Sequence, residues 1–175
     1  MGRKKLLGAA VSLFFSVCAA SAAAISFQII QHDSIQDEIR SASYVVENSL
    51  FDYFFNRGYI ATNSPTAITS SSAEDKTVIY AALSEASEGL CDYFISVAVD
   101  FSENSTNPAA LILSNIKQVS WNVYDVKKGE LLASGKKEPK LTQSNNNERG
   151  LKNFMSNVAV EIESSIAKKG NAKGW

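Results

Sequence analysis

The residues that could do chemistry in this chain of 175 residues are few and scattered. Its one histidine, His32, stands beside Asp33, and a single imidazole without further ligands at suitable spacing does not make a metal site. We therefore expect His32 to be a solvated loop residue. The sequence lacks the nucleophile elbow G-x-S-x-G, the phosphate loop G-x-x-x-x-G-K and the dinucleotide fingerprint G-x-G-x-x-G. It therefore predicts no catalytic residue, no metal site and no cofactor.

Paired carboxylates and one cysteine leave an enzyme open as an alternative. Two close acid pairs lie on predicted helices: Glu85 with Glu88, and Glu161 with Glu163. Two carboxylates can hydrolyse a glycosidic bond, but helix acids at this spacing usually form a solvated face. Cys91 stands just before the apolar run 93–99, so burial of a small side chain explains it better than a nucleophile does.

The first 24 residues have the three-part pattern of a secretory signal peptide. Basic residues at 3–5 precede an apolar run at 6–20 and a stretch of small residues at 20–24. The apolar run is shorter than the roughly 20 residues that a membrane-spanning helix needs. We therefore expect the segment to be removed, which leaves no transmembrane span and a periplasmic or secreted protein. A retained anchor is the alternative.

The cleavage position and a lipid anchor are separate questions. Cleavage after Ala24, with Ala22 and Ala24 at the two small positions, and cleavage after Ala22 both fit the pattern. A lipoprotein needs a cysteine at the cut, and Cys18 is the only candidate. We disfavour lipidation because Cys18 lies inside the apolar run and follows Val17, where lipoprotein signals have a small side chain.

The mature chain is divided by charge. Residues 25–110 contain three basic and twelve acidic side chains, a net charge of −9, whereas residues 111–175 contain eleven basic and six acidic, a net charge of +5. Such a division can steer head-to-tail self-association or docking onto a charged partner, unless the halves interleave in the fold. Neither half has the basic, aromatic-interleaved stripe of a nucleic-acid binder. We expect one domain at 25–170 and a frayed tail at 171–175, without an intramolecular disulfide.

Hydrophobic periodicity predicts an α/β (α+β) fold: a single mixed sheet of four to five strands with three helices, in the approximate order β-α-β-α-β-β-(β)-α. The predicted strands are 25–30, 59–62, 93–101, an alternation within 111–126, and 131–137. The apolar stripe of the last helix is formed by Leu151, Phe154, Met155, Val158, Ile162 and Ile166.

Local signals predict where the other elements begin and turn. The first helix begins at an N-cap, Asp33 or Ser34, and ends at Gly58. The second helix begins at a capping box, either Ser71 with Glu74 or Ser72 with Asp75. The segment Lys127-Lys128-Gly129 predicts a three-residue hairpin turn with a glycine bulge.

The stretch 119–134, in which a D-x-x-x-G-E turn joins two strands, resembles an element of a bacterial envelope superfamily. That group includes the curli secretion lipoproteins, the outer-membrane lipoprotein activators of penicillin-binding proteins and the amino-terminal domain of the Tol system's propeller protein. Residues 47–62 and the A-D-Y-like start of a strand at 91–99 are similar to the same group. The resemblance implies a mixed sheet with helices that docks onto envelope proteins and performs no turnover. The chain has no spare alternating segments for a curli-type membrane barrel.

We therefore predict a non-catalytic exported module that binds a cell-envelope protein, in wall synthesis or outer-membrane assembly. The predicted contact residues are aromatic side chains at the end of the first helix and the basic hairpin tip: Phe51, Tyr53, Phe55, Lys127 and Lys128. Aromatic residues at such a helix end can equally belong to the core. A small envelope hydrolase or thiol enzyme is one alternative, and a self-assembling homo-oligomeric envelope subunit is the other.

Overall fold

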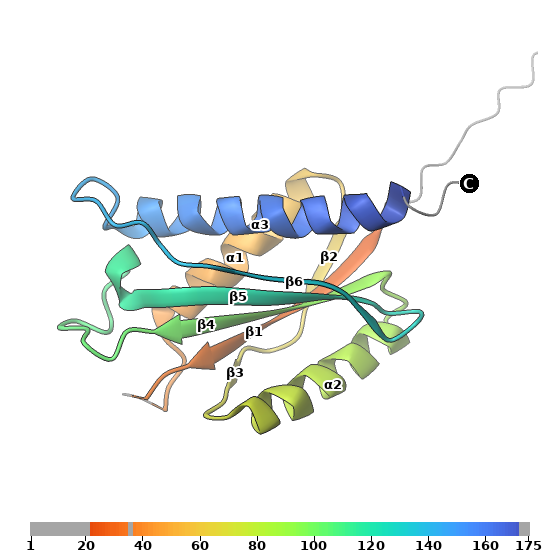
Figure 1. Cartoon of the computed structure of the whole chain (residues 1–175), viewed down its shortest axis with the longest axis horizontal. Helices are drawn as coiled ribbons and strands as arrows, with labels where there is room; N and C mark the ends of the chain where they lie inside the picture. The colour runs from red at the N-terminus through yellow and green to blue at the C-terminus, as the bar shows by residue number, and fades with distance from the viewer. Residues whose placement is uncertain (1–21, 35–36, 172–175) are drawn as a thin grey trace, which may run out of the picture.

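Residues 22–34 and 37–171 are described by the structure, a computed structural model (Figure 1). The strands are β1 (Ala24–His32), β2 (Ile60–Asn63), β3 (Ala67–Ile68), β4 (Tyr93–Phe101), β5 (Ile116–Asp125) and β6 (Glu130–Lys137). The helices are α1 (Ser41–Asn56), α2 (Ser72–Glu88), the short 3-10 helix η1 (Leu113–Asn115) and α3 (Glu148–Asn171). Most of the predicted signal segment, Cys18 and residues 172–175 of the predicted tail lie outside the described residues.

The described strands form one mixed sheet in the order β2-β1-β4-β5-β6, and β3 pairs with β1 beyond the end of β2. β1 is parallel to β2, β3 and β4, while β5 is antiparallel to β4 and β6. The predicted class and element order are confirmed. The sheet has six strands rather than four to five, because β3 is only two residues long and therefore gives no periodic signal.

Alternation along the strands gives the sheet one apolar face, which packs against α1 and α3 (Figure 1). Alternate side chains of β4 and β5 are buried there: Ile95, Val97, Val99, Val119, Trp121 and Val123. The predicted stripe of the last helix is buried against them. The opposite face is more polar, and α2 lies on that side of the sheet, against β1 and β4.

The first helix begins later than the sequence predicted. Neither Asp33 nor Ser34 caps α1, whose N-cap residue, Arg40, makes no capping bond with its side chain. Asp33 instead pairs with the Arg40 guanidinium, and both of these side chains are 1% exposed. The Gln31 side-chain oxygen accepts hydrogen bonds from the Arg40 backbone N–H at 2.9 Å and from Ser43 Oγ at 2.8 Å. Tertiary contacts therefore fix the start of α1.

The second helix begins where the capping box predicted. Ser71 is the N-cap of α2, and its hydroxyl accepts a hydrogen bond from the Glu74 backbone N–H at 3.3 Å. The Glu74 carboxylate in turn accepts a hydrogen bond from the Ser70 backbone N–H at 2.7 Å, one residue before the expected donor. The first of the two predicted boxes is therefore the one that forms.

The β5–β6 hairpin is confirmed, but its turn is one residue longer than predicted. Gly129 has the positive φ of +65° that the glycine bulge required. The loop spans residues 126–129, between the paired residues Asp125 and Glu130. Asp125 stabilises the longer turn, because its carboxylate accepts from the Lys128 backbone N–H and its carbonyl accepts from the Gly129 N–H at 2.8 Å.

Candidate functional site

The two ends of the sheet gather residues that are far apart in the sequence. The carboxyl ends of β1 and β4 meet the first turn of α2 in what we name the strand-end crevice. At the opposite end, the starts of β1, β2 and β4 meet the hairpin tip. The exposed side chains of Phe55, Ile60, Leu90, Lys127 and Lys128 at that end make up what we name the strand-start surface.

The strand-end crevice has a volume of about 440 Å³. The connection through α1 leads to one side of β1, and the connection through α2 leads to the other side across the opposite face of the sheet. The crevice therefore lies at a topological switch point, where open α/β sheets commonly bind ligands. Its lining mixes imidazole, carboxylate, hydroxyl and ammonium groups, among them His32, Ser70, Asp75, Asp100, Glu103 and Lys117.

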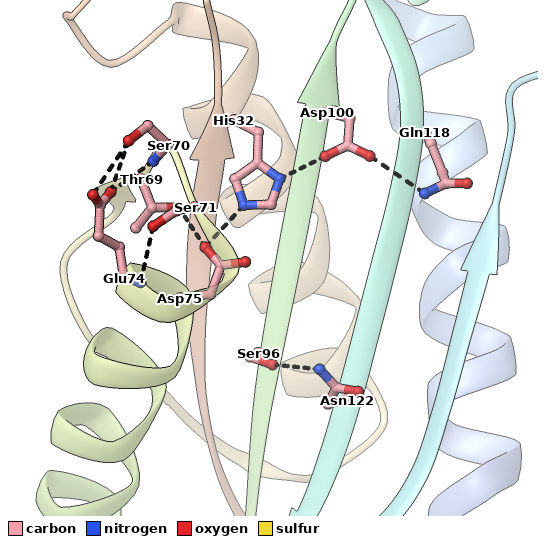
Figure 2. Close-up of polar contacts among 10 residues, drawn as sticks. All are labelled: His32, Thr69, Ser70, Ser71, Glu74, Asp75, Ser96, Asp100, Gln118 and Asn122. Carbon is pink, nitrogen blue, oxygen red and sulfur yellow. Dashed lines mark hydrogen bonds and ion pairs between the residues drawn. The ribbon is translucent and has the colours of Figure 1, made fainter.

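In this crevice the His32 ring lies between two carboxylates (Figure 2). Its Nδ1 is 2.6 Å from Asp100 Oδ1, and its Nε2 is 3.0 Å from Asp75 Oδ1. The Thr69 hydroxyl donates a further hydrogen bond to Asp75, and Gln118 Nε2 donates one to the second oxygen of Asp100 at 3.3 Å. The imidazole thus ties the first turn of α2 to the ends of β1 and β4.

These contacts keep His32 charged. The hydrogen bond to Asp100 is the main cause that raises the pKa of His32 from 6.5 to about 9, against the opposing effect of burial. The same bond lowers the pKa of Asp100. A protonated ring with both nitrogens donating has no lone pair for a general base or a metal ligand. Among the described residues, no group of three or more His, Cys, Asp or Glu side chains is arranged to hold a metal ion.

The prediction that His32 is a solvated loop residue is wrong. It is the last residue of β1, and its side chain is 30% exposed. Its partners Asp75 and Asp100 stand 43 and 68 residues further along the chain. Only the pairing of β1 with β4, which places His32 opposite Asp100, brings the ring and its first partner together.

The strand-start surface is organised around Asp92, which follows Cys91 in the A-D-Y-like segment. Its carboxylate accepts hydrogen bonds from the Ala24 backbone N–H at 3.0 Å and from Lys127 Nζ at 2.8 Å. Its backbone N–H donates to the Ala24 carbonyl, and its carbonyl accepts from the Val126 N–H. These bonds, first that from Lys127 and then that from Ala24, lower the pKa of Asp92. This segment contributes to the family resemblance, but the sequence predicts no contact for Asp92.

The structure brings together some of the predicted contact residues and separates others. Phe55, which is 63% exposed, lies at the end of α1, and Lys127 and Lys128 are exposed at the hairpin tip. Phe51 is half-buried and stacks on Phe55 with ring centroids 6.1 Å apart. Tyr53 is half-buried and donates a hydrogen bond to Glu163 of α3 at 2.7 Å, so its hydroxyl serves the contact between two helices.

Two exposed apolar residues at this end have no counterpart in the sequence prediction. Ile60, at the start of β2, is 58% exposed. Leu90, which follows the C-cap Gly89 of α2, is 83% exposed and has a φ of +56°. A glycine immediately before it is the expected position for the left-handed conformation at a helix end, and this is why Leu90 could not be found from the sequence.

The cysteine and the acid pairs that left an enzyme open as an alternative lie in separate surroundings. Cys91 is 6% exposed and packs with Ala82, Ala86 and Phe94, so its predicted burial is confirmed. Glu85 accepts a hydrogen bond from Ser64, and the other engaged acids pair separately: Glu161 with Lys137, and Glu163 with Tyr53 and Arg57. In the described part of the chain, Glu85, Glu161 and Glu163 therefore each contact different partners.

A family model described as "Uncharacterised protein" matches residues 24–167. The chain belongs to that family. The matched range runs from the first residue of β1 into α3, so it includes both the strand-end crevice and the strand-start surface. A comparison with curated proteins found no match. Over residues 22–34 and 37–171, no helix has both the length and the apolar character needed to cross a bilayer.

Several solved structures are similar to this chain in fold. A PelC dodecamer from Paraburkholderia phytofirmans is 17% identical, with a TM-score of 0.42 over 82% of this chain and 86% of that one. TolB from Acinetobacter baumannii is 14% identical, with a TM-score of 0.44 over 83% of this chain and 28% of that one. The LpoB C-terminal domain from Salmonella enterica is 12% identical, with a TM-score of 0.41 over 70% of this chain and 87% of that one. All three identities lie below 25% and all three TM-scores below 0.5, so these likenesses assign the chain no activity or partner.

Proposed function

We propose that the mature chain is an exported, non-catalytic module that binds a cell-envelope protein through the strand-start surface. Wall synthesis and outer-membrane assembly are the processes in which we expect that partner. The signal-peptide pattern of the first residues supports the location. The single observation that carries the proposal is Leu90, an apolar side chain held in solvent by an unfavourable backbone conformation.

The conformation of Leu90 costs stability. A left-handed φ costs a residue with a Cβ about 1–2 kcal/mol, whereas glycine adopts it freely. The side chain gains little in return within the fold, since it is 83% exposed. A single exposed leucine is ordinary, but Leu90 shares its end of the sheet with the exposed Ile60 and Phe55. Strained residues that persist at a surface are typical of binding sites.

The chemistry of the surface indicates what the partner presents. Apolar side chains at Phe55, Ile60 and Leu90 favour an apolar contact at the centre of an interface. Lys127 and Lys128 stand at its edge; Lys127 is bound to Asp92, whereas among the described residues no ion pair is formed by the exposed Lys128. We therefore expect a partner with an apolar patch flanked by an acidic group that reaches Lys128.

Two observations support binding rather than turnover. The His32 ring donates from both nitrogens and is charged at neutral pH, so it does not act as a base. The Cys91 thiol is buried, whereas a working nucleophile must be reachable.

The test compares capture of one defined partner from envelope extract by the mature chain and three variants. Leu90→Gly should raise the thermal midpoint of unfolding and yet weaken binding about tenfold, which is about 1.4 kcal/mol. Lys128→Glu should weaken binding without changing stability, and it avoids the Asp92 contact that Lys127→Glu would break. Leu141→Ala removes another exposed leucine, from the loop before α3, and serves as the control. Unchanged binding in both Leu90→Gly and Lys128→Glu would contradict the proposal.

Self-assembly is a second candidate, favoured by the strand order. Because β5 and β6 follow β4 across the sheet, the strands of the basic second half lie toward the β6 edge and those of the acidic first half toward the β2 edge, while α3 packs on α1. Oppositely charged edges fit a head-to-tail contact between copies. Sedimentation at low and high salt tests it, since such a contact weakens as salt increases. A monomer at both salt concentrations would rule it out.

A further inference from the structure

Two residues that cleavage after Ala24 would remove, Ala23 and Ala24, already belong to the fold. The Ala23 carbonyl accepts a hydrogen bond from the Ile60 backbone N–H at 3.0 Å. The Ala24 N–H donates to Asp92 Oδ2 at 3.0 Å, and the Ala24 carbonyl accepts from the Asp92 N–H at 2.8 Å. Ala23 and Ala24 are both partly buried, and Ala24 is the first residue of β1.

Cleavage after Ala22, Ala23 or Ala24 would each have a small residue at the first and third positions before the cut, as the signal-peptide pattern requires. The three cuts differ in which hydrogen bonds they remove from the fold. A cut after Ala24 removes all three of these hydrogen bonds and leaves the Asp92 N–H without its acceptor. A cut after Ala23 removes the acceptor of the Ile60 N–H. A cut after Ala22 removes none of them, because Ala22 is exposed and precedes the first hydrogen-bonded residue of this set.

We infer that the exported chain is cut between Ala22 and Ala23. The step is hydrolysis of one peptide bond by water, catalysed by a signal peptidase. It leaves a carboxylate on Ala22 and an α-amino group on Ala23. The recognised segment is Ala20-Ser21-Ala22, which has the A-x-A form with Ser21 at the tolerant middle position. This inference rests on the proposed export of the chain.

The cut also changes the strand-start surface. The new α-amino group stands one residue before the amide that Asp92 holds, beside the start of β2. It adds a positive charge next to Ile60, at the same end as Lys127 and Lys128. In the precursor an uncharged peptide group occupies that position. The surface that we propose for the partner is therefore complete only after processing.

Intact-mass measurement and amino-terminal sequencing of the exported protein test the cut directly. We expect a chain that begins with Ala23. A chain that begins with Ala24 or Ile25 would overturn this inference and leave export standing. A protein that keeps residues 1–22 would overturn export itself, so the two failures are distinguishable.

Substitutions in the leader sharpen the test, since they do not alter the mature protein. Ala20→Tyr places a large side chain at a required small position for the cut after Ala22 only, and it should abolish the Ala23 terminus. Ser21→Tyr is the matched control, because Ser21 is a required small position only for the cut after Ala23. An Ala23 terminus that persists in Ala20→Tyr, or disappears in Ser21→Tyr, would contradict the inference.

The physical premise has its own measurement. Chains beginning at Ala23 and at Ile25 are compared by thermal unfolding under identical conditions. The shorter chain should unfold at a lower temperature, because it lacks the hydrogen bonds of Ala23 and Ala24 to β2 and Asp92. Equal midpoints would show that these residues do not contribute to the fold, and the argument for the cut after Ala22 would fail.

Discussion

The protein should become less stable as the pH rises from about 6 to about 9, because His32 loses its stabilising positive charge over this range. Its hydrogen bond to Asp100 raises the pKa of the folded-state imidazole from 6.5 to about 9. A group with a raised pKa in the folded state binds its proton more tightly there than in the unfolded chain. Its contribution to stability is therefore complete below the unfolded-state pKa of 6.5 and is lost as the pH rises through about 9.

The size of the effect follows from the pKa and the exposure of the ring. A rise from 6.5 to about 9 corresponds to about 3.4 kcal/mol at full strength. The His32 side chain is 30% exposed, and solvent screening reduces the expected loss to about 1–2 kcal/mol. The groups that face the ring are Asp75, Asp100 and the more distant Glu103 and Lys117 of the crevice lining.

Two assays measure this prediction. Because His32 is the only histidine, its ring signal in an NMR pH titration is unambiguous and should titrate near pH 9. Urea unfolding between about pH 6 and about pH 9 gives the accompanying change in the free energy of unfolding. His32→Gln removes the titrating group, and subtracting its pH profile isolates the contribution of His32 from those of the other titratable groups. Glu103→Gln, in the same crevice, is the matched control. A ring that titrates at 6.5 or below, or a His32→Gln profile identical to the wild type, would refute the reasoning.

Three further predictions concern other residues. Asp92→Asn should lower the free energy of unfolding by about 1–2 kcal/mol, because it weakens the charged acceptor shared by Ala24 and Lys127; denaturant unfolding at neutral pH checks this, and the loss should shrink in acid as the wild-type Asp92 becomes protonated. Gly135→Ala should cost about 1–3 kcal/mol, because the new Cβ would overlap the Trp121 ring, at 2.6 Å from Cε2; near-ultraviolet circular dichroism would report the displaced indole, and an unchanged spectrum and midpoint would count against it. Cys91 should react with a thiol reagent only after denaturation, since it is 6% exposed; rapid labelling of the native protein would contradict its burial.

Much of the fold could be predicted because it depends on local periodicity. The alternation in β4 and β5 and the stripe of α3 reflect which face of each element is buried, and a sequence records that directly. The start of α1 could not be predicted in this way. Asp33 has the residue type of an N-cap, but the buried Arg40 competes for its carboxylate, and that competition depends on tertiary packing.

The candidate site depends even more on long-range contacts. The role of His32 arises from strand register and from the place where α2 docks, neither of which leaves a local pattern. The role of Asp92 could not be predicted either, because its partner Ala24 comes from β1 and its partner Lys127 from the turn between β5 and β6. The exposure of Lys128 could be predicted because the turn of a hairpin projects into solvent.

The position of β1 in the sheet has a mechanical consequence. β1 is bonded to β2 and β3 along one edge and to β4 along the other, in parallel register on both sides. Tension applied at Ala24 along the strand axis would load the ladders on both sides of β1 together in shear, because their hydrogen bonds run across the strands. A protein attached at its amino terminus would therefore resist pulling through the strand pairs on both sides of β1.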